Sequence, residues 1–233
     1  MRNIIVIAIL CLAKLAVGQT PNPIITAFPS LQIPVGSRGL AMGTTGIASA
    51  NENEQLFYNS AKTAFTKNFH QASVSWCPWL ADITEDTRML NLNYTGNISN
   101  SSSIGFSLAY LSLGSFPIKD DNGATNAIYK SSEYHLAGSY ALQLSSKSSL
   151  GIGLRFIASQ PIPILDPNQL STVPKNMYSI AADLSYYGFT DLEDKDQKIE
   201  WGAVISNLGP KVNLQGSNSK TFLPTNLGIG IGY

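Results

Sequence analysis

The chain has 233 residues, a formal net charge of zero and only 13% charged residues. This length suits one domain or one large assembly unit. The charge balance gives no electrostatic basis for binding nucleic acid. After the first residues, no stretch runs 18 or more apolar residues, which excludes a bundle of membrane helices.

The first residues, MRNIIVIAILCLAKLAVGQT, are typical of a secretory signal peptide. Arg2 supplies the positive charge, residues 4–12 form the apolar run, and residues 16–18 form a small-x-small cleavage site. The alternative is an N-terminal anchor helix, but the apolar run is too short to cross a bilayer. We therefore expect residues 1–18 to be lost on export, which leaves Cys77 without a partner for an internal disulfide.

Residues 19–69 differ in composition from the rest of the chain. They begin proline-rich, become glycine-rich and end in a stretch compatible with one short helix. The glycines do not form a phosphate-binding loop, because no Gly-Lys-Ser/Thr ending and no preceding buried strand accompany them. Close packing of backbone inside a barrel is the better use for glycines at Gly36, Gly39, Gly43 and Gly46.

From residue 70 onward, eight segments alternate with a period of two, which predicts β-strands. In each of them large apolar side chains alternate with mostly small or weakly polar ones. A soluble sandwich would carry Lys, Glu and Thr on its polar face, whereas charge occurs here only singly, as at Arg155, Asp183 and Glu200. The segments are 70–77, 89–98, 104–113, 133–142, 148–158, 178–187, 199–206 and 222–233.

This pattern predicts an all-β fold, a transmembrane antiparallel β-barrel, with the large side chains toward lipid and the small ones toward an enclosed interior. Most segments reach the roughly 9–11 residues that a spanning strand needs. Long and short connections alternate, so we expect the loops 78–88, 114–132, 159–177 and 207–221 to share the outward end. The alternative is a soluble sandwich or a lipocalin-like barrel.

The barrel interior raises a question of space. An eight-stranded barrel holds only its own side chains and has no room for a segment of about fifty residues. Either residues 19–69 lie outside the barrel, or residues 70–233 are about eight strands of a larger, incomplete barrel. We favour the larger barrel, with residues 19–69 as its N-terminal plug.

Three stretches resemble a known family. Residues 36–65, GSRGLAMGTTGIASANENEQLFYNSAKTAF, resemble the N-terminal plug of FadL-like outer-membrane proteins, and Ser60 stands where those proteins carry proline. SWCPWLADI and FLPTNLGIGIGY are similar to segments of the PorV family of the Bacteroidetes type IX secretion system. RGLAMGTTGIA also fits the wider PorV/PorQ set, while Pro-Trp-Leu at 78–80 favours PorV. By this resemblance, the plug residues are Gly39, Met42, Gly43, Asn59 and Ala61.

The resemblance implies a non-enzymatic protein of the bacterial outer membrane. Its partners would be secreted cargo proteins with a C-terminal sorting domain, other components of the translocon and attachment complex, and outer-membrane lipid. A FadL-like passive transporter of hydrophobic small molecules is the alternative. An outer-membrane lipid hydrolase is a third hypothesis, but the sequence has no Gly-x-Ser-x-Gly elbow.

Two groups of residues outside the plug are candidate sites. His135, Arg155 and Asp183 all fall on the inward face of their strands, where polar side chains are the norm for a barrel lumen. Trp76, Pro78, Trp79 and Leu80 end a strand at the outward side, as a lipid-interface anchor or a surface for docking a partner. His70 and His135 lack cysteines at ligand spacing, so we expect neither a metal nor a cofactor.

Overall fold

The structure is a computed structural model. It describes residues 26–49, 54–66, 69–80, 82–119, 125–161, 175–192, 197–213 and 220–233. The predicted signal peptide at 1–18 lies outside the described residues. Within the described ranges, no helix combines the length and apolarity needed to cross a membrane.

The dominant feature is an eight-stranded antiparallel sheet with the order β1-β2-β3-β4-β5-β6-β7-β10. A separate two-stranded sheet pairs β8 with β9. The strands are β1 (His70–Pro78), β2 (Thr87–Ser99), β3 (Ser102–Lys119), β4 (Thr125–Ser145), β5 (Ser148–Gln160), β6 (Met177–Asp191), β7 (Lys198–Leu208), β8 (Val212–Asn213), β9 (Lys220–Thr221) and β10 (Asn226–Gly232). All eight predicted segments are therefore found as neighbouring strands, which confirms the predicted all-β, antiparallel fold.

The predicted limits of several strands were wrong. Residues 114–132 were predicted as a loop, but β3 and β4 continue through most of them as a paired arm. The pairing shifts at Gly114, whose φ is 94°, and this bulge breaks the period-two pattern on which the prediction depended. The last predicted segment, 222–233, starts pairing only at Asn226.

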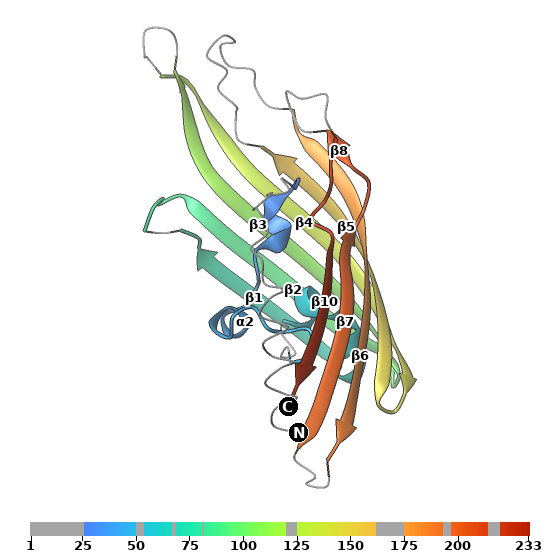
Figure 1. Cartoon of the computed structure of the whole chain (residues 1–233). Helices are drawn as coiled ribbons and strands as arrows, with labels where there is room; N and C mark the ends of the chain where they lie inside the picture. The colour runs from blue at the N-terminus through green and yellow to red at the C-terminus, as the bar shows by residue number, and fades with distance from the viewer. Residues whose placement is uncertain are drawn as a thin grey trace, which may run out of the picture.

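The sheet is curved but not closed. In the described part of the chain, β1 pairs only with β2, and β10 pairs only with β7. The last residues of β1, β3, β5 and β7 lie at one end of the sheet, which we call the long-loop end, and the tight turns at 100–101 and 146–147 lie at the other, the tight-turn end (Figure 1). The C-terminal residue lies toward the tight-turn end (Figure 1).

The two faces of the sheet differ as the alternation predicts. On β5, Ile152 and Leu154 are 58% and 74% exposed, whereas Ser149 and Gly151 are buried. β4 shows the same contrast between Leu136, which is exposed, and His135, which is buried. The large apolar side chains thus cover the convex, outward face, and the small or polar ones lie beneath another part of the chain.

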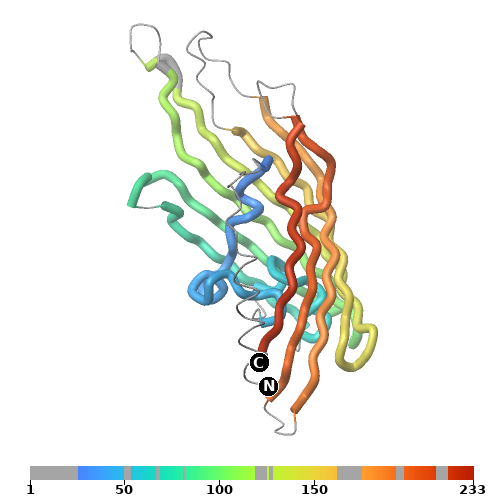
Figure 2. Tube along the Cα trace, viewed as in Figure 1, coloured from blue at the N-terminus to red at the C-terminus, as the bar shows by residue number. Residues whose placement is uncertain are grey.

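That covering part is the N-terminal region, and we call residues 26–49 and 54–66 the plug segment. It contains η1 (Pro29–Gln32), α2 (Ser37–Ala41), α3 (Gln55–Tyr58) and η2 (Ser60–Phe65), so the single short helix predicted here is instead several short pieces. The plug segment lies along the inward side of the curved sheet, beside β10 (Figure 2).

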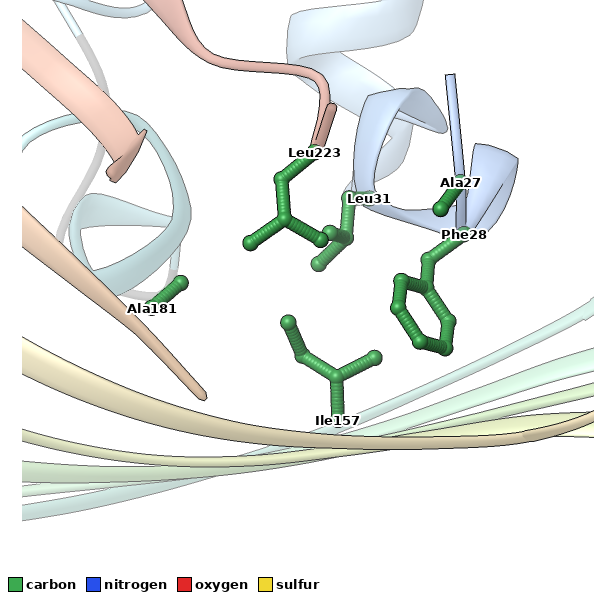
Figure 3. Packing of buried hydrophobic residues seen from close by; sticks show 6 residues of the cluster. All are labelled: Ala27, Phe28, Leu31, Ile157, Ala181 and Leu223. Atoms are coloured by element: carbon green, nitrogen blue, oxygen red, sulfur yellow. The ribbon is translucent and has the colours of Figure 1, made fainter. Parts of the chain in front are cut away.

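Two apolar clusters hold the plug segment to the sheet. The first joins residues 27–31 of the plug segment to β5, β6 and the residues before β10 (Figure 3). Its buried members are Ala27, Phe28, Leu31, Ile157, Ala181 and Leu223. The second is centred on Val35, Met89 and Leu111. Burying these side chains supplies most of the non-directional attraction between the two parts.

Candidate functional site: the interface between plug and barrel wall

Asn59 is the most heavily bonded residue of the plug segment. Its side-chain nitrogen donates to the carbonyl oxygens of Ile47, at 2.8 Å, and Tyr186, at 2.9 Å. Its side-chain oxygen accepts from the backbone N–H of Ala61 at 3.1 Å, which caps η2. One buried amide therefore joins two stretches of the plug to the wall strand β6.

The next two residues bind a pair of serines on the wall. The hydroxyl of Ser185 on β6 accepts from the backbone N–H of Ala61 and lies 3.0 Å from the hydroxyl of Ser60. The hydroxyl of Ser149 on β5 donates to the carbonyl oxygen of Ala61 at 2.7 Å. Because these groups are buried, each would be costly to leave without a partner.

The remaining residues of η2 continue this pattern onto other strands. The Thr63 hydroxyl lies 2.7 Å from that of Ser103 on β3. The Gln143 amide on β4 donates to the carbonyl oxygen of Ala64 at 2.6 Å. The small polar residues of the inward face thus serve as anchoring points for one short 3-10 helix.

Lys62 makes the charged contact of this interface. Its ammonium donates to the carbonyl oxygen of Ala48 at 2.8 Å and lies 3.3 Å from the Glu200 carboxylate on β7. The Tyr187 hydroxyl donates to the same carboxylate at 2.7 Å. Burial lowers the pKa of Lys62, and the nearby Glu200 partly offsets that effect.

Glycines on the wall let the plug come close. A Cβ atom on Gly151 would lie only 2.6 Å from the backbone nitrogen of Ala61. On Gly202 it would lie 2.5 Å from the carbonyl oxygen of Ile47 and 2.7 Å from the Asn59 amide nitrogen. These two positions accept no side chain because the plug backbone occupies the space.

A second polar anchor lies nearer the long-loop end. The Ser30 hydroxyl bonds to the Glu133 carboxylate on β4 and lies 2.6 Å from Nε2 of His135. The backbone N–H of Ser30 donates to the same carboxylate at 3.1 Å, and the Ser159 hydroxyl donates to its other oxygen. All four side chains are buried.

The three predicted lumen residues are close together but have different partners. Arg155 and Asp183 form an ion pair with a 2.8 Å contact between Nη2 and Oδ2. The other oxygen of Asp183 accepts from the backbone N–H of Asn207 at 2.7 Å. His135 is instead bonded to Ser30 of the plug segment.

The Ser30 cluster does not have the geometry of a hydrolase. Glu133 accepts from the Ser30 hydroxyl rather than from the imidazole of His135, so the three groups do not form a serine–histidine–acid relay. The adjacent cavity is only about 30 Å³, too small for a lipid substrate. In the described residues, no group of three His, Cys, Asp or Glu side chains is placed to hold a metal ion.

The five predicted plug residues lie in different environments. Asn59 and Ala61 are fully buried at the wall. Gly39 is buried against the side chain of Tyr58. Met42 is 47% exposed, and Gly43, with a φ of 73°, forms the exposed turn after α2.

The four candidate residues at the end of β1, Trp76, Pro78, Trp79 and Leu80, do not all lie on the same face. Trp76 and Leu80 are exposed, as is Pro78, the last residue of the strand. Trp79 lies on the other side, packed against the buried Val35, Met89 and Leu111 cluster. Leu80 has a φ of 54°, and the chain reverses direction there.

Cavities of different sizes lie between the plug segment and the wall. A cavity of about 30 Å³ adjoins Asn59 and Ser60. A larger one, of about 400 Å³, lies between the plug segment and the wall formed by β7 and β10. Among the residues around it are Leu31, Pro34, Ile47, Phe57, Arg155, Val204 and Asn226.

Several residues of this interface were not among the sequence-based candidates. Glu133 has the same strand parity as His135 and was therefore detectable as an inward charge. Ser30 and Lys62 carried no comparable signal, because the plug segment has no periodicity that would indicate which side chains contact the wall.

One comparison with known proteins identifies a family for this chain. A family model, Type IX secretion system protein PorV, matches residues 17–233, nearly the whole chain. A comparison with curated proteins finds no match. The chain therefore belongs to the PorV family and is a β-rich outer-membrane component of the type IX secretion system, where it acts with other components of that system.

Proposed function

We propose that this protein is a non-enzymatic docking barrel for secreted cargo. It binds the C-terminal sorting domain of the cargo at the long-loop end and passes the cargo to the surface attachment complex. Its lumen is not the cargo pore. The observation that carries this proposal is the network of bonds between the plug segment and the wall.

That network would obstruct the passage of a folded protein. Groups on five successive strands bind the plug, and they are Ser103, Gln143, Ser149, Ser185 and Glu200. The cavity of about 30 Å³ beside Asn59 is of the size of a single water. A folded protein would have to break most of these bonds to pass, which supports binding at the surface instead.

The arm formed by β3 and β4 beyond Gly114 is a candidate contact surface. Its paired strands reach far beyond the neighbouring β1 and β2 at the long-loop end (Figure 1). Ile128 on this arm is 67% exposed. A rigid paired arm with an exposed apolar side chain can bind a partner at a lower ordering cost than a free loop.

The test is to shorten the arm and to measure binding of a purified sorting domain. Residues 116–129 are replaced by Asn-Gly, which joins the paired residues Ser115 and Lys130 by a two-residue turn. We expect the dissociation constant for the sorting domain to rise about tenfold or more. Secretion of cargo by the same cells should fall in parallel.

The matched control places Asn-Gly at the tight-turn end, in place of Ser146 and Lys147 between the paired residues Ser145 and Ser148. This change should leave binding and secretion unaltered. If the unaltered protein does not bind a sorting domain, the docking proposal is wrong. If binding survives shortening of the arm, the contact lies on another loop.

The cavity of about 400 Å³ is the observation that favours the alternative function, passive transport of hydrophobic small molecules. Its lining combines apolar side chains with Arg155 and Asn207, which would suit a hydrophobic molecule with one polar end. Cells that lack the protein should then lose uptake of a labelled hydrocarbon. Loss of uptake without any defect in secretion would favour transport over docking.

A further inference from the structure

The wall is interrupted between β6 and β7. Their pairing runs from Asp191 with Lys198 to Ala182 with Leu208, and its register shifts between Ala182 and Leu184. β6 begins at Met177, so its first five residues lie beyond the last paired residue of β7. The convex face is therefore indented at this point.

Specific contacts hold the interruption in place. Asn207 has a φ of 58° and lies at the register shift, after which only Leu208 is still paired with β6. Its backbone N–H donates to Asp183, its side-chain amide donates to the carbonyl oxygen of Pro224, and its carbonyl oxygen accepts from the Thr225 hydroxyl. The backbone N–H, the backbone carbonyl and the side-chain amide of Asn207 all form hydrogen bonds here. These bonds stabilise the irregular pairing of β6 with β7.

The resulting groove has a volume of about 520 Å³ and an apolar lining. Large side chains form its sides, and small residues form its floor. The sides include Phe106, Leu136, Leu154, Phe156, Ile180 and Leu208, and the floor includes Gly138, Ala182 and Gly209. Gly209 contacts the carbonyl group of Ile180 so closely that a Cβ atom there would overlap it.

The groove is closed toward the interior. Ala181, which also borders the groove, packs on its inward side against Ile157, Leu223 and Phe28 (Figure 3). Arg155 also borders the groove, but its guanidinium is paired with Asp183. The groove therefore ends at a packed floor, and its lining is almost entirely apolar.

We propose that this groove binds a single acyl chain of an outer-membrane lipid. It lies within the exposed apolar face of an outer-membrane protein, so membrane hydrocarbon is the medium around it. A chain lying in the groove contacts both its floor and the large side chains beside it, whereas elsewhere on the convex face it contacts only the outermost side chains. Because an acyl chain buries more area in the groove than elsewhere on the convex face, it should bind there with higher affinity and a longer residence time.

The experiment uses the full-length protein in phosphatidylethanolamine vesicles that contain a small fraction of the same lipid with a photoactivatable diazirine on one acyl chain. After irradiation, the labelled residues are mapped by mass spectrometry. We expect labelling to concentrate at 136–138, 154–156, 180–182 and 208–210, above that at equally exposed positions such as Ile152 and Ile229.

The decisive variant fills the groove. A Cβ atom on Gly138 would lie 3.8 Å from the nearest atom of Phe106, an ordinary contact, so Gly138→Leu creates no clash at its Cβ atom. Its side chain excludes roughly two methylenes of lipid, and labelling in the groove should fall on the order of tenfold. Labelling at Ile152 should not change.

A second pair of variants covers the case in which Gly138→Leu does not fold. Ile180→Ala removes one side of the groove and should lower groove labelling several-fold, whereas Ile152→Ala, at a similarly exposed position outside it, should not. Labelling spread evenly over the convex face, or unchanged by both groove variants, would overturn the proposal.

Discussion

At the scale of single residues, Asn59 is the position where the attachment of the plug is most concentrated. Replacing Asn59 by Ala would leave the carbonyl oxygens of Ile47 and Tyr186 without their donor and would remove the cap of η2. We expect the free energy of unfolding to fall by roughly 2–4 kcal/mol, because buried groups without partners are costly. Urea unfolding in phospholipid vesicles measures this change.

The control for this variant is Asn100→Ala, which removes the same amide from an exposed tight turn. It should change the free energy of unfolding by less than about 0.5 kcal/mol. If both substitutions changed the free energy of unfolding equally, the hydrogen bonds of Asn59 would contribute no more to stability than an exposed amide does. In that case the serines of the wall, rather than the amide, would carry the attachment.

At the scale of elements, β5 and η2 pack closely because Gly151 on β5 has no side chain and so leaves room for the backbone of η2. Gly151→Ala would place a methyl group 2.6 Å from the backbone nitrogen of Ala61. We expect it to destabilise the docked plug by about 1–3 kcal/mol, since the rigid backbone on both sides cannot move apart easily. Faster proteolysis within residues 54–66 would report the loosened plug.

Gly153→Ala is the matched control, because Gly153 lies two residues along the same strand and on the same face. Its Cβ atom would lie 3.4 Å from the Cβ of Asp183, an ordinary contact. Proteolysis of the plug should therefore stay at the level of the unaltered protein. A similar increase in both variants would show that glycine is needed for the strand itself and not for the close approach.

At the scale of the whole molecule, we predict that the convex face contacts lipid. Ile152 is 58% exposed on this face, in the middle of β5. Ile152→Arg should lower the free energy of unfolding in phospholipid vesicles by about 2–4 kcal/mol, because a charge near the bilayer midplane is costly. Asn100→Arg, at the tight-turn end, should cost less than about 1 kcal/mol.

A different result would change the view of the whole molecule. If Ile152→Arg were as well tolerated as Asn100→Arg, the convex face would meet water or another protein at this depth. The acyl-chain groove would then lose its basis as well, since it lies within the same face.

Local pattern was enough to predict which way most strand residues face. Arg155, Asp183 and His135 were assigned to the inward side from their parity alone, and all three are largely buried there. Parity is a local property, because successive side chains of a strand point to opposite faces whatever the rest of the chain does. The prediction was wrong where a bulge interrupts this rule, at Gly114.

The sequence by itself thus determined the sheet, the two faces and the resemblance to one family. Only the tertiary structure decided which groups meet, such as Ser30 with His135, 105 residues apart, or Lys62 with Glu200, 138 residues apart. It also turned Trp79 inward while its neighbour Trp76 stays on the convex face. The physical reason is that periodicity encodes the direction of a side chain relative to its own strand, whereas a partner depends on how distant segments pack in three dimensions.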